Sequence, residues 1–217
     1  MDFLSAYTPS NLLYLWEGFQ VTLLLALIAI ICSYVVGIVL GILRYAKIPV
    51  ISRVLGAAVD IIRCLPLLLI LFFTHFVLLP ELGFQVSPFV AAIVALTVFE
   101  GAMISEIIRS GLNSIPKGQI EAARSSGLTY TQTLRAILIP QAARKMMPPT
   151  VSQFIALLKD TSLAVIITLP EVMHHARILS AHNSNSVFAI LFFVAVMYFV
   201  VNFALSKIAK KLEAKHV

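Results

Sequence analysis

The chain has 217 residues, of which 60% are hydrophobic and only 12% are charged, and its mean hydropathy is +0.98. Soluble domains carry about 25% charged residues, so this composition excludes an ordinary soluble protein and predicts a membrane protein. The formal net charge of +6 does not require a nucleic-acid partner, because membrane topology and anionic lipid account for it.

Five apolar stretches are long enough to cross a membrane as helices. A hydrocarbon core about 30 Å thick takes roughly 20 helical residues to cross, and continuous apolar runs favour helices over the alternating strands of a barrel. We therefore predict an all-α polytopic membrane protein with one transmembrane domain at residues 19–208. The predicted spans cover residues 19–43, 55–79, 89–108, 149–169 and 187–208.

Lysine and arginine residues fall almost entirely on one side of these spans. The positive-inside rule therefore places the N-terminus outside and the C-terminus in the cytoplasm. The only basic residue of the outer segments is Arg177. The basic residues of the inner side are Arg44, Lys47 and Arg53 in the first loop, Lys117, Arg124, Arg135, Arg144 and Lys145 in the loop 112–147, and Lys207, Lys210, Lys211 and Lys215 in the tail.

The first two spans carry small residues and a proline with structural consequences. Gly37 and Gly41 form a small face that favours close helix packing, either within one subunit or between two. Pro66 is expected to kink or open the second span, and Arg63 lies close enough to the cytoplasmic face to reach water.

Ionisable residues in the third and fourth spans are the candidate pathway residues. A charge at membrane depth is costly, about 2.5–3.5 kcal/mol on insertion scales, so it faces protein or a water-filled cavity. Glu100 lies in the third span, and Asp160 lies in the fourth beside Thr161 and Ser162. The alternative is that the two acids pair with Lys159, Arg63 or a neighbouring subunit. Glu106 and Arg109, three residues apart, are expected to form an intrahelical pair or to anchor the loop.

The loop 112–147 contains helix signals although it leaves the membrane. Pro116 suits a first helical turn, and Lys117–Ser126 then forms a helix roughly 15 Å long. Gly127 occupies a position that favours a left-handed C-terminal cap. Thr129 and Gln132 match a capping box that begins the next helix.

This short helix has a surface that suits a protein partner. Ala122 and Ala123 leave one side nearly bare, and Glu121 and Arg124 can support one another or bond a partner. The alternative is an ordinary amphipathic connector on the membrane surface. Pro140, Pro148 and Pro149 are expected to mark helix boundaries in the segment that returns to the membrane. In the outer loop, adjacent His174 and His175 splay apart, so no metal site is predicted there with His182; these histidines, Glu171 and Arg177 are candidates to dock an outer partner or to cover the pathway mouth.

The loop also resembles a known family signature. Glu121-Ala122-Ala123, three residues, Gly127, nine residues and Ile137-x-Ile139-Pro140 resemble the signature loop of permease subunits of bacterial ABC importers, with isoleucine at 139 instead of leucine. Four further runs resemble the polar amino acid uptake subfamily. They are Arg63–Pro66, Ser105–Gly111, Pro116–Gln119 and Lys159–Leu163.

The resemblance implies a type I importer fold, a place in the bacterial plasma membrane and a set of partners. Two permease subunits, identical or paralogous, enclose the pathway, and an extracytoplasmic solute-binding protein delivers an amino acid. Two cytoplasmic ATPase subunits receive the short helix and bind ATP and Mg²⁺, whereas this chain binds no cofactor, has no phosphate-binding loop and is no enzyme. The implied coupling residues are Pro116, Gly118, Gln119, Glu121, Ala122, Ala123 and Gly127.

The substrate is left open by the sequence. Asp160 or Glu100 is expected to take an ammonium group, and the Thr161 and Ser162 hydroxyls or a helix end the carboxylate. A sibling importer for cystine or an opine fits equally well. A channel-like membrane subunit and an intramembrane enzyme are the remaining alternatives, and the sequence offers no motif for the nucleophile–base pair that such an enzyme needs.

Overall fold

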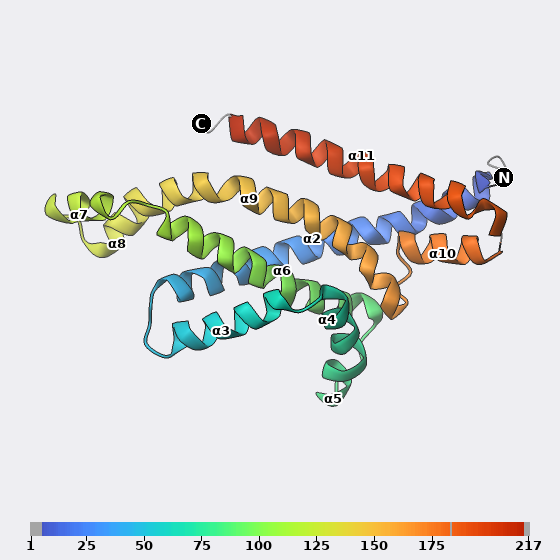
Figure 1. Ribbon diagram of the computed structural model, residues 1–217, viewed down its shortest axis with the longest axis horizontal. Helices are drawn as coiled ribbons and strands as arrows, with labels where there is room; N and C mark the ends of the chain where they lie inside the picture. The colour runs from blue at the N-terminus through green and yellow to red at the C-terminus, as the bar shows by residue number, and fades with distance from the viewer. Residues whose placement is uncertain (1–5, 183, 215–217) are drawn as a thin grey trace.

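The computed structural model describes residues 6–182 and 184–214, and every regular element in these ranges is helical (Figure 1). Lys215 of the predicted basic tail lies outside the described residues. The first described long helix, α2 (Pro9–Tyr45), has 37 residues and begins well before the predicted span. Thr8 caps it by accepting a hydrogen bond from the Asn11 amide (3.3 Å), and Pro9 occupies its first turn, where a missing N–H costs nothing.

The second predicted span is broken. Helix α3 (Ile51–Cys64) and the following run, α4 (Leu67–Phe73), π-helical η1 (Thr74–Leu78) and α5 (Leu79–Glu81), meet at an angle of 104°. Leu65 is extended (φ −88°, ψ 145°), the conformation that a following proline imposes. The predicted opening at Pro66 is confirmed, and the predicted second span corresponds to this bent pair of helices.

The remaining helices follow the predicted order with different boundaries. Helix α6 (Pro88–Asn113) is the third span, and α11 (Val187–Ala214) is the last. Between them lie α7 (Lys117–Ser125), α8 (Tyr130–Thr133), π-helical η2 (Leu134–Leu138), α9 (Ile139–Asp160), the 3₁₀ helix η3 (Thr161–Ile167), α10 (Val172–His182) and η4 (Ser184–Ser186). In the described residues four helices are long and apolar enough to span a membrane, or five with the bent pair.

More prolines lie inside helical segments than the sequence predicts. Pro148 and Pro149 lie inside α9, and the predicted fourth span corresponds to the C-terminal half of a helical run from Tyr130 to Ile167. Each π-helical segment ends two residues before a proline, Pro80 after η1 and Pro140 after η2. In a regular α-helix the proline ring clashes with the carbonyl four residues earlier, and the wider turn relieves this clash.

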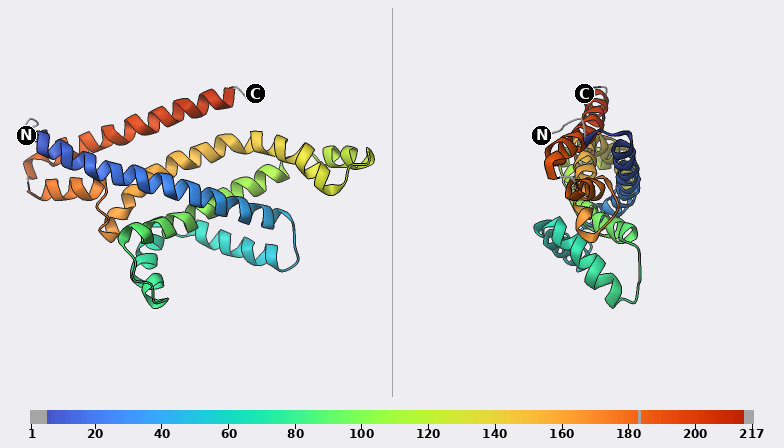
Figure 2. Two further views of the ribbon diagram at one scale, coloured as in Figure 1. Left: turned by 180° about the vertical axis from the view of Figure 1, so that it is seen from behind. Right: turned by 90° about the vertical axis from the view of Figure 1, so that its right-hand side faces the viewer.

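The long helices lie side by side, and the two ends of the bundle differ (Figures 1 and 2). Helices α7 and α8 project at one end, which we call the α7 end. The N-terminal part of α2 and α10 lie at the other end, which we call the α10 end, while α4 and α5 project sideways from the bundle. The C-terminal part of α2 and the start of α3 point toward the α7 end, so the loop with Lys47 lies on that side.

Helix α2 approaches α6 at its glycines. A Cβ atom placed on Gly37 would lie 2.5 Å from Ile104 Cγ2, and one on Gly41 would lie 2.6 Å from Ile108 Cβ. These distances are far below ordinary van der Waals contact, so only glycine permits this spacing. The small face therefore serves packing within one subunit, which was one of the two predicted roles.

We expect Gly37→Ala to destabilise the protein, because overpacking against Ile104 costs about 1–3 kcal/mol. The melting temperature of the purified protein should fall by about 3 °C or more. Gly56→Ala is the matched control, since the nearest atom to its added methyl group is Arg44 Nε at 4.0 Å. A Gly37→Ala variant as stable as this control would contradict the packing role.

Candidate functional site

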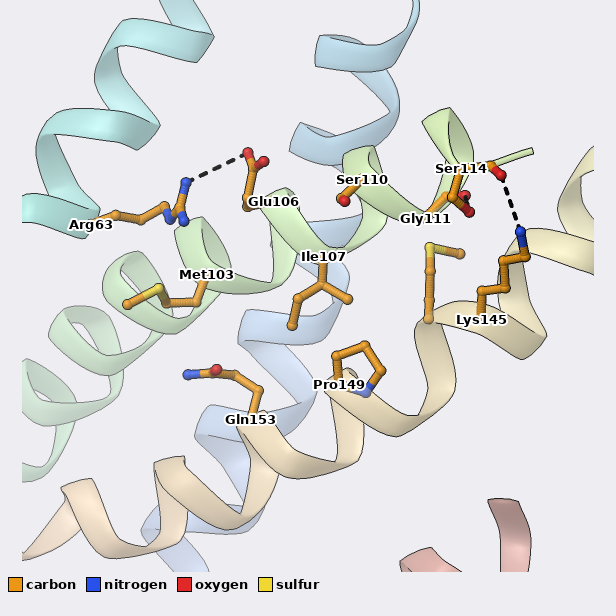
Figure 3. A pocket seen from close by; sticks show the side chains of 11 residues that line it. Arg63, Met103, Glu106, Ile107, Ser110, Gly111, Ser114, Lys145, Pro149 and Gln153 are labelled. Atoms are coloured by element: carbon orange, nitrogen blue, oxygen red, sulfur yellow. Dashed lines mark hydrogen bonds and ion pairs between the residues drawn. The ribbon is translucent and has the colours of Figure 1, made fainter. Parts of the chain in front are cut away.

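A cavity of about 520 Å³ lies between α6 and α9, with Arg63 of α3 at its edge (Figure 3). Gln153 of α9 and Met103 of α6 face the same space. Toward the α7 end, the Lys145 ammonium donates a hydrogen bond to the Ser114 carbonyl (3.0 Å) and links the two helices. The cavity therefore has polar groups along its length and walls from two helices that are far apart in sequence.

A buried acid lies behind this cavity. Glu100 of α6 is fully buried, and its Oε2 accepts a hydrogen bond of 2.7 Å from the Gln153 amide. Its Oε1 has no hydrogen-bond partner within 3.5 Å among the described residues. Sequence reasoning missed Gln153, because an uncharged amide in an apolar helix gives no signal of its own.

The structure brings together two of the four predicted pathway residues. Asp160, at the end of α9, is half-buried and close enough to Glu100 for the two carboxyl groups to interact. Thr161 is fully buried and donates to the Leu158 carbonyl (2.7 Å), while Ser162 donates to the Lys159 carbonyl (2.7 Å). Both hydroxyls thus serve the turn from α9 into η3, and the substrate role of all four residues stays a prediction.

Helix α7 forms much as the sequence predicts. Gly127 has a left-handed backbone (φ +86°), and its amide donates to the Arg124 carbonyl (3.0 Å). The Leu128 amide donates to the Ala123 carbonyl (3.2 Å), which completes a glycine-capped helix end. Pro116 is the residue just before the helix instead of lying within its first turn.

The next helix also begins as predicted. The Thr129 hydroxyl accepts from the Gln132 amide (3.3 Å), and the Gln132 side chain accepts from the Thr129 amide (2.8 Å). This reciprocal pair is the predicted capping box. Together with Gly127 it fixes the direction in which α8 leaves α7.

The surface of α7 differs from the prediction at one residue. Ala123 is buried, on the side of α7 that faces α8 and η2, so it does not leave a bare face for a partner. Arg124 donates to the Leu128 carbonyl (3.1 Å) and makes no ion pair with Glu121. The other predicted coupling residues are all exposed, namely Pro116, Gly118, Gln119, Glu121, Ala122 and Gly127.

Comparison with known proteins identifies the family. A sequence profile for the binding-protein-dependent transport system inner membrane component matches residues 33–215. The chain belongs to this family. It is a multi-pass permease component of the bacterial plasma membrane, and the resemblance drawn from its motifs is confirmed.

Relatives and a solved structure agree with this assignment. The probable glutamine ABC transporter permease protein GlnP of Bacillus subtilis is 57% identical to the permease over 217 residues, 99% of each chain. The L-cystine transport system permease protein TcyB of the same organism is 34% identical over 92% of this chain and 84% of its own. The crystal structure of an amino acid ABC transporter with histidines superimposes with a TM-score of 0.90 at 28% identity, covering 99% of both chains. The all-α type I importer fold is thereby established.

A cluster of charges holds three helices of the permease together beside the cavity. The predicted pair of Glu106 and Arg109 is present. Glu106 Oε2 also lies 3.0 Å from Arg44 Nη1 of α2 and 3.6 Å from Arg63 Nη1 of α3. Arg44 Nη2 lies 3.6 Å from Asp60 Oδ1. The sequence gives Arg44 only as a loop charge, because contacts between helices leave no periodic signal along the chain.

Glu171 is buried in the permease and does not offer a docking surface. It accepts hydrogen bonds from the Met173 amide (2.9 Å) and the His174 amide (2.8 Å), and from the Thr22 hydroxyl (3.4 Å). The carboxylate thus caps α10 and ties it to α2. Beside it, the His175 ring stacks on Tyr14 with centroids 3.9 Å apart. The predicted docking role is therefore wrong for Glu171.

We expect the stability of the permease to depend on the charge of Glu171. Burial raises the pKa of this carboxyl from 4.5 to about 7, so the unfolded chain loses the proton at lower pH than the folded one. Stability from this group is therefore present at low pH and is lost as pH rises from about 4.5 to about 7. The loss of thermal stability between pH 5.5 and pH 7.5 should be smaller in Glu171→Gln than in the wild-type protein.

The comparison needs a control because other groups titrate nearby. Burial lowers the pKa of His174, and this effect is common to both proteins. Glu17→Gln, an exposed change on α2, should keep the wild-type pH profile. Equal profiles for Glu171→Gln and the wild type would contradict the prediction.

Proposed function

We propose that this permease carries polar amino acids into the cell through the cavity between α6 and α9, driven by ATP hydrolysis in two partner subunits. Glutamine is the first candidate substrate, because the relative at 57% identity is a probable glutamine permease. Cystine is the second candidate, because another relative transports it. The permease pairs with a second permease subunit and receives its substrate from an external binding protein, and the family description, a binding-protein-dependent transport system, supports the second of these partners.

The observation that carries the proposal is the position of α7 in the chain. Helix α7 follows α6 directly and leads through Gly127 into α8 and α9. It therefore joins the two helices that form the cavity walls. A partner that binds the exposed side of α7 and moves it must change the spacing of these walls. ATP-driven closure of two such partners would open and close the pathway.

The proposed orientation places the α7 end in the cytoplasm and the N-terminus outside. Basic residues in three segments support this orientation. These segments are the α2–α3 loop, the stretch from α7 to α9 and the end of α11. Such an excess of basic residues in short loops marks the cytoplasmic side. The cavity mouth near Lys145 then opens toward the cytoplasm.

The proposed substrate contacts are a pair of carboxyl groups for the ammonium of an amino acid and a guanidinium group for its carboxylate. Glu100 and Asp160 provide carboxyl groups for an ammonium group, and Gln153 links Glu100 to the cavity. Arg63 lines the same cavity, and its Nε has no hydrogen-bond partner among the described residues. A guanidinium is well suited to bind a carboxylate. The proposed binding pose of the amino acid has its carboxylate toward Arg63 and its ammonium toward Gln153 and the buried Glu100 behind it.

We expect Gly127→Val to uncouple ATP hydrolysis from uptake in proteoliposomes that contain the whole complex. A β-branched residue at φ +86° is strained by about 1–3 kcal/mol, so the end of α7 would change direction. ATPase activity should persist while uptake falls at least several-fold. Gly83→Val is the matched control, because Gly83 has the same backbone (φ +82°) at the end of α5, away from α7. Wild-type uptake in Gly127→Val would contradict the proposal that α7 transmits the movement of the ATPase subunits to the cavity walls.

We expect Glu100→Gln and Asp160→Ala to lower amino acid uptake about 10-fold or more while leaving the complex assembled. Loss of one charged hydrogen bond to a bound ligand is worth about 1.5–3 kcal/mol, which supports this magnitude. Uptake of labelled glutamine and cystine, with size-exclusion analysis of each complex, measures both effects. Glu81→Gln, an exposed change at the end of α5, should leave uptake unchanged. A complex that falls apart instead would show that the acids are structural.

A further inference from the structure

A second, apolar groove runs along the outside of the bundle at the α7 end. One wall is α2 and the other is the run from α8 into α9, while Ile108 and Leu112 of α6 form the floor. Its volume is about 320 Å³, and it continues into a second apolar hollow of about 370 Å³ that shares Tyr34, Ile108, Ala143 and Met146. The groove is lined by residues of α9 other than those that line the substrate cavity, and the two spaces share only Met146.

The packing of α2 explains why the groove exists. Its glycine face is pressed against α6, which leaves the neighbouring stripe of Tyr34, Ile38 and Ile42 without a helix to cover it. Ile42 is 46% exposed and Ile139, on the opposite wall, is 44% exposed. Two apolar walls thus face each other across a space that no described residue fills.

The two connected hollows extend from Phe154 at one end to Ala46 and Tyr130 at the other, which is the mouth of the groove. The rings of Tyr34 and Phe154 meet edge to face, with centroids 5.7 Å apart, and they prevent a closer approach of α2 to α9. From Tyr34 to Ala46 the α2 wall has 12 residue steps, roughly 18 Å at 1.5 Å per residue. This length is close to half of a hydrocarbon core of about 30 Å. One leaflet's acyl chain would fill such a groove.

Two basic residues lie next to lining residues at the mouth of the groove. Lys47 follows Ala46 at the mouth of the groove, with a left-handed backbone (φ 53°), and its side chain is exposed. Arg135 follows Leu134 of the opposite wall in the chain, and its side chain is exposed. Neither makes an ion pair within 4 Å with any carboxylate in the part of the chain that the structure describes. Tyr130 also lies at this end, where tyrosine favours the membrane interface.

We propose that this groove binds one anionic phospholipid, with an acyl chain between α2 and α9 and the phosphate group between Lys47 and Arg135. The choice of an anionic lipid rests on the orientation given under the proposed function, which places the α7 end at the cytoplasmic leaflet. Anionic headgroups attract basic residues at that surface. The bound lipid joins α2 to the α8 wall, so it would hold the helix that follows α7 against the bundle.

The test measures lipid retained by the purified transporter complex. The complex is equilibrated in mixed micelles with equal amounts of phosphatidylglycerol and phosphatidylcholine, washed on a column, and its lipids are counted by mass spectrometry. We expect the wild-type complex to retain phosphatidylglycerol several-fold over phosphatidylcholine. Ala143→Trp and Ile42→Trp, which fill the groove, should lose most of it. Ala136→Trp, the same change at an exposed position that does not line the groove, should retain it.

A charge variant tests the headgroup site separately. Lys47→Gln with Arg135→Gln should retain both lipids about equally, because the apolar groove remains while its cations are gone. Arg53→Gln with Lys210→Gln removes two exposed cations elsewhere on the same side and should keep the preference for phosphatidylglycerol. If this control loses the preference to the same extent, general surface charge accounts for retention and the headgroup site is excluded.

Three other results would overturn the proposal. Equal retention by Ala143→Trp, Ile42→Trp and Ala136→Trp would show that the lipid is not in the groove. Equal retention of both lipids by the wild-type complex would show that the retained lipid is only the ordinary lipid that surrounds the protein. Disulfide formation between two permease chains carrying Ile42→Cys would show that a second copy covers the groove. The uncoupled Gly127→Val complex should still retain the lipid, so failure of the transport proposal and failure of the lipid proposal are distinguishable.

Discussion

The contact between α2 and α6 determines the arrangement of the helices around it. Gly37 and Gly41 allow the two backbones to approach until only a hydrogen atom fits between α2 and the isoleucines of α6. This approach brings Arg44, at the end of α2, within 3.0 Å of Glu106. Glu106 in turn attracts Arg63, so α3 is held at the edge of the cavity. In the membrane, where lipid tails are as apolar as the side chains, such close packing and polar contacts replace the hydrophobic effect between helices.

Helix α9 borders two spaces with different chemistry. The cavity contains Arg63, Glu106, Lys145 and Gln153 and leads to the buried acid Glu100. The groove against α2 is lined by apolar and aromatic side chains. A polar solute and an acyl chain would therefore meet different faces of one helix. Because α9 connects through α8 to α7, both faces are linked mechanically to the helix proposed to meet the ATPase.

Local features of the chain were predictable because their causes lie within a few residues. The cap at Gly127, the capping box of Thr129 and Gln132, and the pair of Glu106 and Arg109 all depend on neighbours within one helical turn. The opening at Pro66 follows from a missing amide and a ring clash. The two π-helical turns before Pro80 and Pro140 have the same local cause, although the sequence predictions treated Pro140 as a break.

The linear chain alone predicts a helical membrane protein, the short helix α7, the caps at Gly127 and Thr129 and the family, because composition, turn chemistry and motif spacing depend only on the order of residues. The packed fold, in contrast, brings Gln153 to Glu100, buries Glu171 and turns Ala123 inward. It also decided that α2 and α9 leave a groove between them. These facts depend on which helix faces come together, and residues far apart in sequence settle that by shape and charge.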